Sequence, residues 1–95
     1  MAEYEIGNQS LASIIRYAQG DHSHLATVTD PKTKRTKFVF ADDPPGTCAE
    51  IAHRFWEPDS VAVTNARELL ECNRALRKSI AESLKLGGKW ENDQQ

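Results

Sequence analysis

The spacing of apolar residues predicts three helices. From residue 8 to residue 20 the apolar positions follow the i, i+3, i+4, i+7 pattern of one helix face: Leu11, Ile14, Ile15 and Ala18. The same spacing returns after a Thr47-x-x-Glu50 capping box: Cys48, Ile51, Ala52 and Phe55. A third helix is expected to begin at Asn65 and to end at Gly87-Gly88, over a length of about 30 Å at 1.5 Å per residue.

The third helix is expected to be amphipathic. Its apolar face holds Ala66, Leu69, Leu70, Leu76, Ile80 and Leu84. Its charged face holds Arg67, Glu71, Arg74, Lys78, Glu82 and Lys85, where ion pairs between turns are expected. Asn73 falls within the apolar face, so its amide needs a partner, either a neighbouring loop or strand backbone or a residue across a subunit interface.

Short segments rich in β-branched and aromatic residues predict four strands. They are residues 4–6, 25–29, 36–41 and 61–63, and the second and third form a hairpin with a polar tip. The predicted order β-α-β-β-α-β with a long last helix indicates an α+β fold, in which helices pack on one face of a four-stranded, largely antiparallel sheet. A split β-α-β (ferredoxin-like) sheet is the first expectation, and an irregular sheet around the central hairpin is the alternative.

One domain is expected over residues 1–88, followed by a mobile tail at 89–95 that shows no periodicity. Its core is expected to bring together Phe38 or Phe40, Phe55, Leu69, Leu76 and Ile80. In the tail, Trp90 is expected either to fold back onto the body or to contact a partner.

The composition is that of a globular protein. Of the 95 residues, 39% are hydrophobic and 27% are charged, and the formal net charge of −2 gives no global attraction to nucleic acid or to an anionic membrane. No basic leader with an apolar stretch opens the chain and no apolar run is long enough to span a bilayer, so a cytoplasmic protein with reduced Cys48 and Cys72 is expected.

No combination of residues predicts catalysis, a cofactor or a metal. His22 and His24 are two residues apart, as a pair of metal ligands can be, but further ligands at zinc-site spacing are missing. The chain has no nucleophile elbow and no glycine-rich phosphate loop after a strand. The acidic pairs Asp42-Asp43 and Glu57-x-Asp59 lie beside Pro and Gly, where solvated turn residues are expected.

The predicted hairpin tip is strongly basic. Its cations fall within six residues: Lys32, Lys34, Arg35 and Lys37. Such a projection can contact phosphates, and Arg74, Arg77, Lys78 and Lys85 could enlarge the basic area. Lysines at a hairpin tip also keep a protruding strand pair soluble, which is the favoured interpretation.

The apolar pattern resembles a family of short bacterial domains of unknown function. The resemblance rests on Leu11-Ala12, Gly20, Phe38-Val39-Phe40, Phe55-Trp56, Val61-Ala62-Val63 and the leucine-rich last helix. It implies a compact helix, hairpin, helix, strand and helix, and it implies no activity. The longer and more basic hairpin tip departs from that pattern.

The sequence therefore favours a small non-enzymatic interaction domain that binds a protein partner or self-associates. Asn73, Arg77 and Trp90 are the candidate interface residues. The alternative is a nucleic-acid-associated protein that uses the basic hairpin 31–37, and a small enzyme or metal protein is the second, disfavoured alternative.

Overall fold

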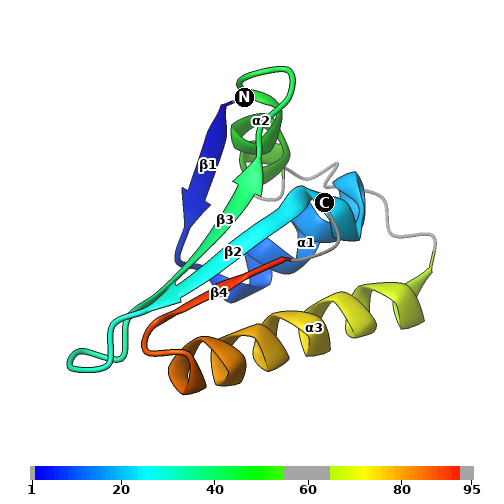
Figure 1. Ribbon diagram of the computed structural model, residues 1–95. Helices are drawn as coiled ribbons and strands as arrows, with labels where there is room; N and C mark the ends of the chain where they lie inside the picture. Colours follow the sequence, from blue (N-terminus) through cyan, green and yellow to red (C-terminus); the bar gives the residue numbers. More distant parts are fainter. Residues whose placement is uncertain (1, 55–64, 93–95) are drawn as a thin grey trace.

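The computed structural model describes residues 2–54 and 65–92, and Figure 1 shows their arrangement. In chain order the elements are β1 (Glu3–Ile6), α1 (Gln9–Gln19), a 3-10 turn (Asp21–Ser23), β2 (His24–Thr29), β3 (Thr36–Ala41), α2 (Thr47–Arg54), α3 (Ala66–Lys85) and β4 (Lys89–Glu91). The predicted strand 61–63 and the candidate core residue Phe55 lie outside the described residues.

Asparagine side chains begin two of the helices, as the sequence predicts. The Leu11 amide donates to Asn8 Oδ1 at 3.0 Å, and the Glu68 amide donates to Asn65 Oδ1 at 3.1 Å. The expected capping box at Thr47 does not form: the Glu50 amide donates to Gly46 O at 3.0 Å, and the Thr47 hydroxyl donates to the Pro44 carbonyl. Asp42 caps α2 in its place, accepting from the amides of Gly46 at 3.0 Å and Cys48 at 2.9 Å.

The sheet has the order β1-β3-β2-β4, and every neighbouring pair is antiparallel. Strands β1 and β2 both run antiparallel to β3 between them, so they are parallel to each other and α1 connects them as a split β-α-β unit. The ferredoxin-like expectation is correct for this half of the sheet. The fourth strand of the described sheet is a segment that was not predicted as a strand, and it lies beside β2, whereas a ferredoxin-like sheet places its fourth strand beside β1.

Residues 89–91 are a strand, which corrects the expectation of a mobile tail from residue 89. Trp90 pairs with Thr27, and its indole packs over the His24 ring at a centroid distance of 4.9 Å. Backbone bonds hold both ends of the strand, from the Thr29 amide to Gly88 O at 2.7 Å and from the Asn92 amide to Leu25 O at 2.9 Å. The strand consists of one aromatic residue between two charged ones and follows Gly87-Gly88 directly, so it lacks the β-branched residues that marked the other strands.

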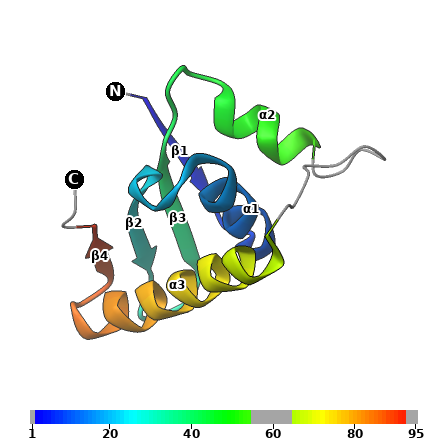
Figure 2. The same cartoon turned by 90° about the vertical axis from the view of Figure 1, so that its right-hand side faces the viewer.

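The core lies between the sheet and the helices. Helices α1 and α3 lie on the same side of the sheet (Figure 2), and α2 packs against α1. The buried cluster consists of Ala12, Ile15, Phe38, Phe40, Cys48 and Leu76, with Ile80 packed against it. The expected core residues Phe38, Phe40, Leu76 and Ile80 are therefore confirmed, whereas Leu69 is half-buried outside this cluster.

The buried face of α3 differs from the predicted apolar face. Leu70 and Leu84 are 59% and 41% exposed, and Ala66 is exposed. The face turned to the sheet and to α1 carries Cys72, Leu76, Ser79 and Ser83. Leucine periodicity misplaced the face because two buried positions are serines, which pattern analysis counts as polar.

A buried polar network supplies hydrogen-bond partners for the buried serines of α3. In this network Arg16 Nη1 lies 2.6 Å from His24 Nδ1, His24 Nε2 lies 2.9 Å from Thr27 Oγ1, and Thr27 Oγ1 lies 2.8 Å from Ser79 Oγ. The Ser79 hydroxyl donates to the Leu76 carbonyl at 2.6 Å. Every polar side chain of β2 and α3 in this network has a hydrogen-bond partner, so none of them is buried with an unsatisfied donor or acceptor.

The network fixes the direction of each hydrogen bond. Because the one Ser79 proton goes to Leu76 O, Thr27 must donate to Ser79 and His24 Nε2–H must donate to Thr27. The Nδ1 atom of His24 is then left without a proton and accepts from Arg16. His24 is therefore neutral, and burial together with the Arg16 charge lowers its pKa from 6.5 to about 4.

Two further sets of hydrogen bonds hold α3 in place. The Thr29 hydroxyl lies 2.8 Å from Ser83 Oγ, and the Ser83 hydroxyl donates to Ile80 O at 2.7 Å. Asn73 Oδ1 accepts from Gln9 Nε2 at 2.8 Å and from the Ser13 hydroxyl at 3.1 Å. The expectation that Asn73 binds a backbone group is therefore wrong, because its side-chain oxygen accepts hydrogen bonds from side chains of α1.

A pair of leucines on α3 tests the assigned face. Leu76→Ala is expected to lower the free energy of unfolding by about 2–5 kcal/mol, because Leu76 is fully buried. Leu70→Ala is the matched control and is expected to change it by less than about 0.5 kcal/mol. Urea denaturation measures both values. Equal effects from the two substitutions would show that this face of α3 is assigned wrongly.

The neutral state of His24 predicts acid sensitivity. Because its folded pKa is about 4 and its unfolded value is 6.5, its contribution to stability is complete above pH 6.5 and is lost as pH falls through 4. The loss over this window amounts to about 3 kcal/mol. His24→Gln, whose amide can donate and accept but does not titrate, is expected to flatten the pH dependence of the free energy of unfolding between pH 6.5 and 4.

Exposed His22 provides the control, and His22→Gln is expected to keep the wild-type pH profile. Denaturation curves at a series of pH values measure all three proteins. A wild-type profile in the His24→Gln protein would contradict the neutral assignment.

Candidate functional site

The four expected cations lie on a protruding hairpin, here called the basic finger and defined as residues 30–37. Figure 1 shows its turn extending beyond the sheet and the end of α3. Lys32, Lys34, Arg35 and Lys37 are all exposed. The finger is formed by the two central strands, β2 and β3.

The turn of the finger is ordered by backbone hydrogen bonds. Asp30 Oδ1 accepts from the Lys32 amide at 2.8 Å, and the Lys34 amide donates to Asp30 O at 2.8 Å. The Asp30 amide donates to Arg35 O at 2.9 Å. Amides of Lys32 and Thr33 lower the pKa of Asp30, so this carboxylate is ionised and is used within the turn. The side chains of the four cations are left directed to solvent.

Two more lysines lie at the base of the finger. The Thr29 amide donates to Gly88 O, which brings the α3–β4 connection against the finger. Gly88 has a φ of +124°, and a Cβ there would lie 3.1 Å from Thr29 O, so glycine permits this close approach. Lys85 ends α3 and Lys89 begins β4 on either side of this contact. Lys89 was missed by sequence analysis because its segment was expected to be mobile.

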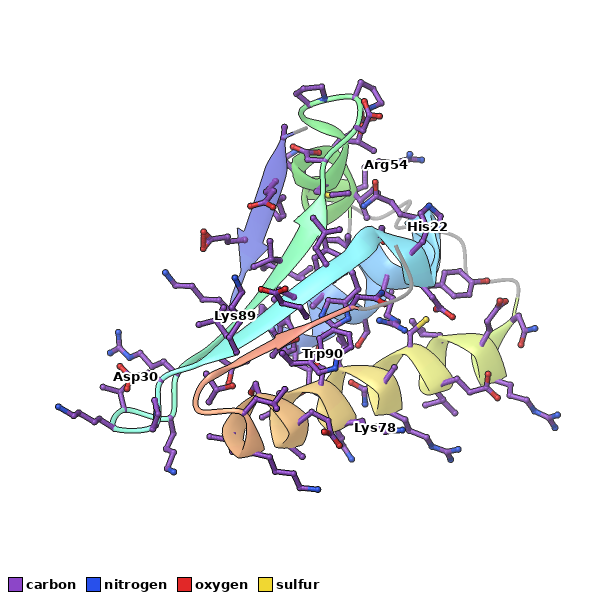
Figure 3. All side chains as sticks on the ribbon, in the orientation of Figure 1. His22, Asp30, Arg54, Lys78, Lys89 and Trp90 are labelled. Atoms are coloured by element: carbon purple, nitrogen blue, oxygen red, sulfur yellow. The ribbon has the colours of Figure 1, made fainter. Side chains whose placement is uncertain are left out.

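A line of exposed residues on α3 continues from Lys85. Arg74, Lys78, Ala81 and Lys85 are spaced i, i+4, i+7, i+11, which places them on one helix face about 16 Å long. We call this line the α3 stripe; Figure 3 labels Lys78 on it and Asp30 in the finger. Within residues 2–54 and 65–92 the ion pairs are Arg16–Asp21 and Lys89–Glu91, so the expected pairs with Glu71 and Glu82 do not form.

The turn acids lie at the other end of β3. Asp42 follows β3 at the end opposite the finger, roughly 20 Å away at 3.3 Å per residue. It is buried, and hydrogen bonds from the Cys48 and Gly46 amides lower its pKa, which corrects the expectation of a solvated turn residue. Asp43 is exposed, and Glu57 and Asp59 lie outside the described residues.

The two candidate metal ligands are separated by their environments. His22 is exposed, whereas His24 is buried and both of its ring nitrogens are used within the buried polar network. In the part of the chain that the structure describes, no group of three His, Cys, Asp or Glu side chains is placed to hold a metal ion. Cys48 and Cys72 are buried free thiols, and burial raises the pKa of Cys48 to about 11 and also raises that of Cys72. Both are therefore protonated at neutral pH and are poor nucleophiles.

A groove of about 490 Å³ lies between α3 and β4. Its lining carries cations and acids together: Arg16, Asp21, Lys78, Glu82, Trp90 and Glu91. Ser79, the hydroxyl in this lining, donates to Leu76 O and accepts from Thr27. The Ser79 hydroxyl is therefore used within the fold, where it joins α3 to β2.

The candidate interface residues have different surroundings. Asn73 is bound by α1, and Trp90 is folded back onto His24, the first of the two expectations for this side chain. Arg77 is exposed on α3. Lysine and arginine side chains of the finger and of α3 are thus the accessible candidates, and the Thr29–Gly88 contact holds the end of α3 beside the base of the finger.

No helix of the described residues has the length and apolar character to cross a membrane. A comparison with protein-family models, with curated proteins and with solved structures finds no match to this chain. The resemblance to short bacterial domains thus stays a prediction from the apolar pattern, and the function is argued from the chain's own geometry.

Proposed function

We propose that this chain is a non-enzymatic binding domain that holds the phosphate backbone of a nucleic acid against its basic finger and α3 stripe. The observation that carries the proposal is the contact between Thr29 and Gly88, at 2.7 Å. It joins two groups of cations that are about fifty residues apart along the chain into one surface.

The number of cations on this surface suits a polyanion. The finger supplies four and α3 adds Arg74, Lys78 and Lys85, whereas Lys89 is paired with Glu91 at 3.1 Å. Each phosphate that they neutralise releases condensed counterion, so a surface of this kind gives salt-dependent binding without reading base sequence. The net charge of −2 gives no global attraction, so binding depends on this local concentration of cations.

Solubility accounts for only part of the basic surface. Lysines prevent strand association where unpaired backbone groups are open to another chain. Strand β1 pairs with β3 only as far as Phe38, and β4 pairs with β2 only as far as Val28, so the finger projects beyond both edge strands. Edge protection can therefore explain the lysines of the finger, but it does not explain the cations of the α3 stripe, which lie on a helix.

Self-association through α3 is disfavoured by charge. The exposed Leu70 and Leu84 lie two turns on either side of Arg77 on one helix face. Pairing this face with a second copy, parallel or antiparallel, would place Arg77 against its own counterpart. Like charges in contact destabilise such an interface.

A protein partner is the second candidate function, and the uncovered face of the sheet favours it. The side of the sheet opposite α1 and α3 has a shallow hollow lined by Leu25, Val28 and Val39 among Glu3, Glu5 and Lys89. Val28 is 38% exposed there. A partner on this face would leave the basic finger free, so the two candidates are separable by mutation.

Charge reversal in the finger tests the proposal. If six cations contact phosphates, the logarithm of the DNA-binding constant should fall with the logarithm of salt concentration with a slope of about −5. Lys34→Glu/Arg35→Glu is expected to reduce affinity at least about tenfold and to reduce the slope by about 2. Fluorescence anisotropy over a range of salt concentrations measures both quantities.

The control uses single charge reversals. Lys34→Glu and Arg54→Glu make the same change in net charge, and Arg54 lies at the end of α2, away from both the finger and the α3 stripe. Arg54→Glu is expected to bind with nearly wild-type affinity, whereas Lys34→Glu binds more weakly. Salt-insensitive binding by the wild type, or equal losses in the two single variants, would refute contact through the finger.

A further inference from the structure

The structure assigns double-stranded nucleic acid as the ligand, an inference that rests on the proposed function. Three features of the basic surface carry it: the absence of aromatic platforms, the rigidity of the finger, and the division of the cations between two fixed elements.

The basic surface offers no row of aromatic rings on which successive unpaired bases could stack. Among residues 2–54 and 65–92 the aromatic side chains of Phe38 and Phe40 are buried, and Trp90, half-buried at the groove between α3 and β4, packs over His24. Tyr4 packs against the core, and the Tyr17 hydroxyl accepts from the Asn65 amide at the far end of α3. Proteins that hold single strands rely on such rings for much of their affinity, whereas a duplex presents its phosphates outward and needs none.

The finger has the form of a preorganised projection. Its turn is closed by the Asp30–Arg35 and Lys34–Asp30 backbone bonds, and the Asp30 carboxylate binds the Lys32 amide. A two-stranded ribbon of this kind fits a nucleic-acid groove, which has a row of phosphates along each side. Lys32, Lys34 and Arg35 at the turn can therefore face phosphates on either side of one groove.

The second element is held at a fixed position relative to the first. The Thr29–Gly88 and Thr29–Ser83 bonds join the base of the finger to the end of α3, and Thr27–Ser79 joins β2 to the next turn of the helix. Two rigid basic elements suit a stiff ligand, because neither side must lose conformational freedom on binding. A flexible single strand would lose that freedom and would gain no stacking in return.

Binding to four labelled probes tests the inference. The probes are a DNA duplex and an RNA duplex of about two helical turns, and a single strand of the same length from each. Under one salt condition, anisotropy is expected to show at least one duplex bound about tenfold more tightly than either single strand. Preference for the DNA duplex or for the RNA duplex identifies the source of the phosphates, and either result supports the inference.

Variants of the stripe provide the second measurement. Arg74→Ala/Lys78→Ala removes two cations from α3 and is expected to weaken duplex binding about tenfold, while Arg54→Glu, with the same change in net charge at the end of α2, leaves it unchanged. All three positions are exposed, so the variants are expected to melt as the wild type does.

The outcomes separate the two proposals. Single strands bound as tightly as the duplexes, with binding still lost on Lys34→Glu/Arg35→Glu, would overturn the duplex inference and keep the proposed function. Duplex binding that Arg74→Ala/Lys78→Ala leaves intact would also overturn it, because the finger would then act alone. Absence of salt-sensitive binding to all four probes would refute the proposed function, and the inference with it.

Discussion

The packing of α3 on β2 depends on hydroxyl groups that must find partners, because Thr27, Thr29, Ser79 and Ser83 occupy positions where apolar side chains ordinarily meet. His24 completes this arrangement only in its neutral form, which donates to Thr27 and accepts from Arg16. Because hydrogen bonds are directional, they fix both the position of α3 along its axis and its rotation about that axis. Leucine packing alone would tolerate small shifts of the helix. The buried polar network thus determines where the outer face of α3 points.

That rotation connects the interior with the basic surface. When Ser79 and Ser83 face β2, the residues Arg74, Lys78 and Lys85 must lie on other sides of the helix and reach solvent. The same rotation leaves Leu70 and Leu84 exposed with Arg77 between them. One constraint inside the protein therefore produces the stripe and prevents the helix from offering a purely apolar face to a second copy.

Local signals in the sequence were sufficient for most elements and insufficient for their assembly. Asn8 and Asn65 correctly marked the starts of two helices, and the β-branched runs correctly marked the hairpin. The predicted rotation of α3 was wrong because Ser79 and Ser83 are buried by hydrogen bonds to β2, which lies more than fifty residues earlier in the chain. Strand β4 was missed because its stability comes from Trp90 against His24 and not from a pattern within three residues. The four finger cations were recognisable from sequence, but Lys89 joined them only through a tertiary contact.

The position of β4 in the chain affects how the protein can fold. Strand β2 occupies the interior of the sheet, yet Asn92 and the serines of α3, which bind it, are separated from it by 52 to 68 residues in the hydrogen bonds that join them, and β4 pairs with it from the same end of the chain. Contacts of such separation form late, because a long loop must close before any of them stabilises the chain. During synthesis, β2 therefore keeps one edge and its polar side chains open to water until Glu91 has been added. The hairpin has its native neighbours on the β1 side long before that, so the last strand completes a sheet whose other half is already assembled.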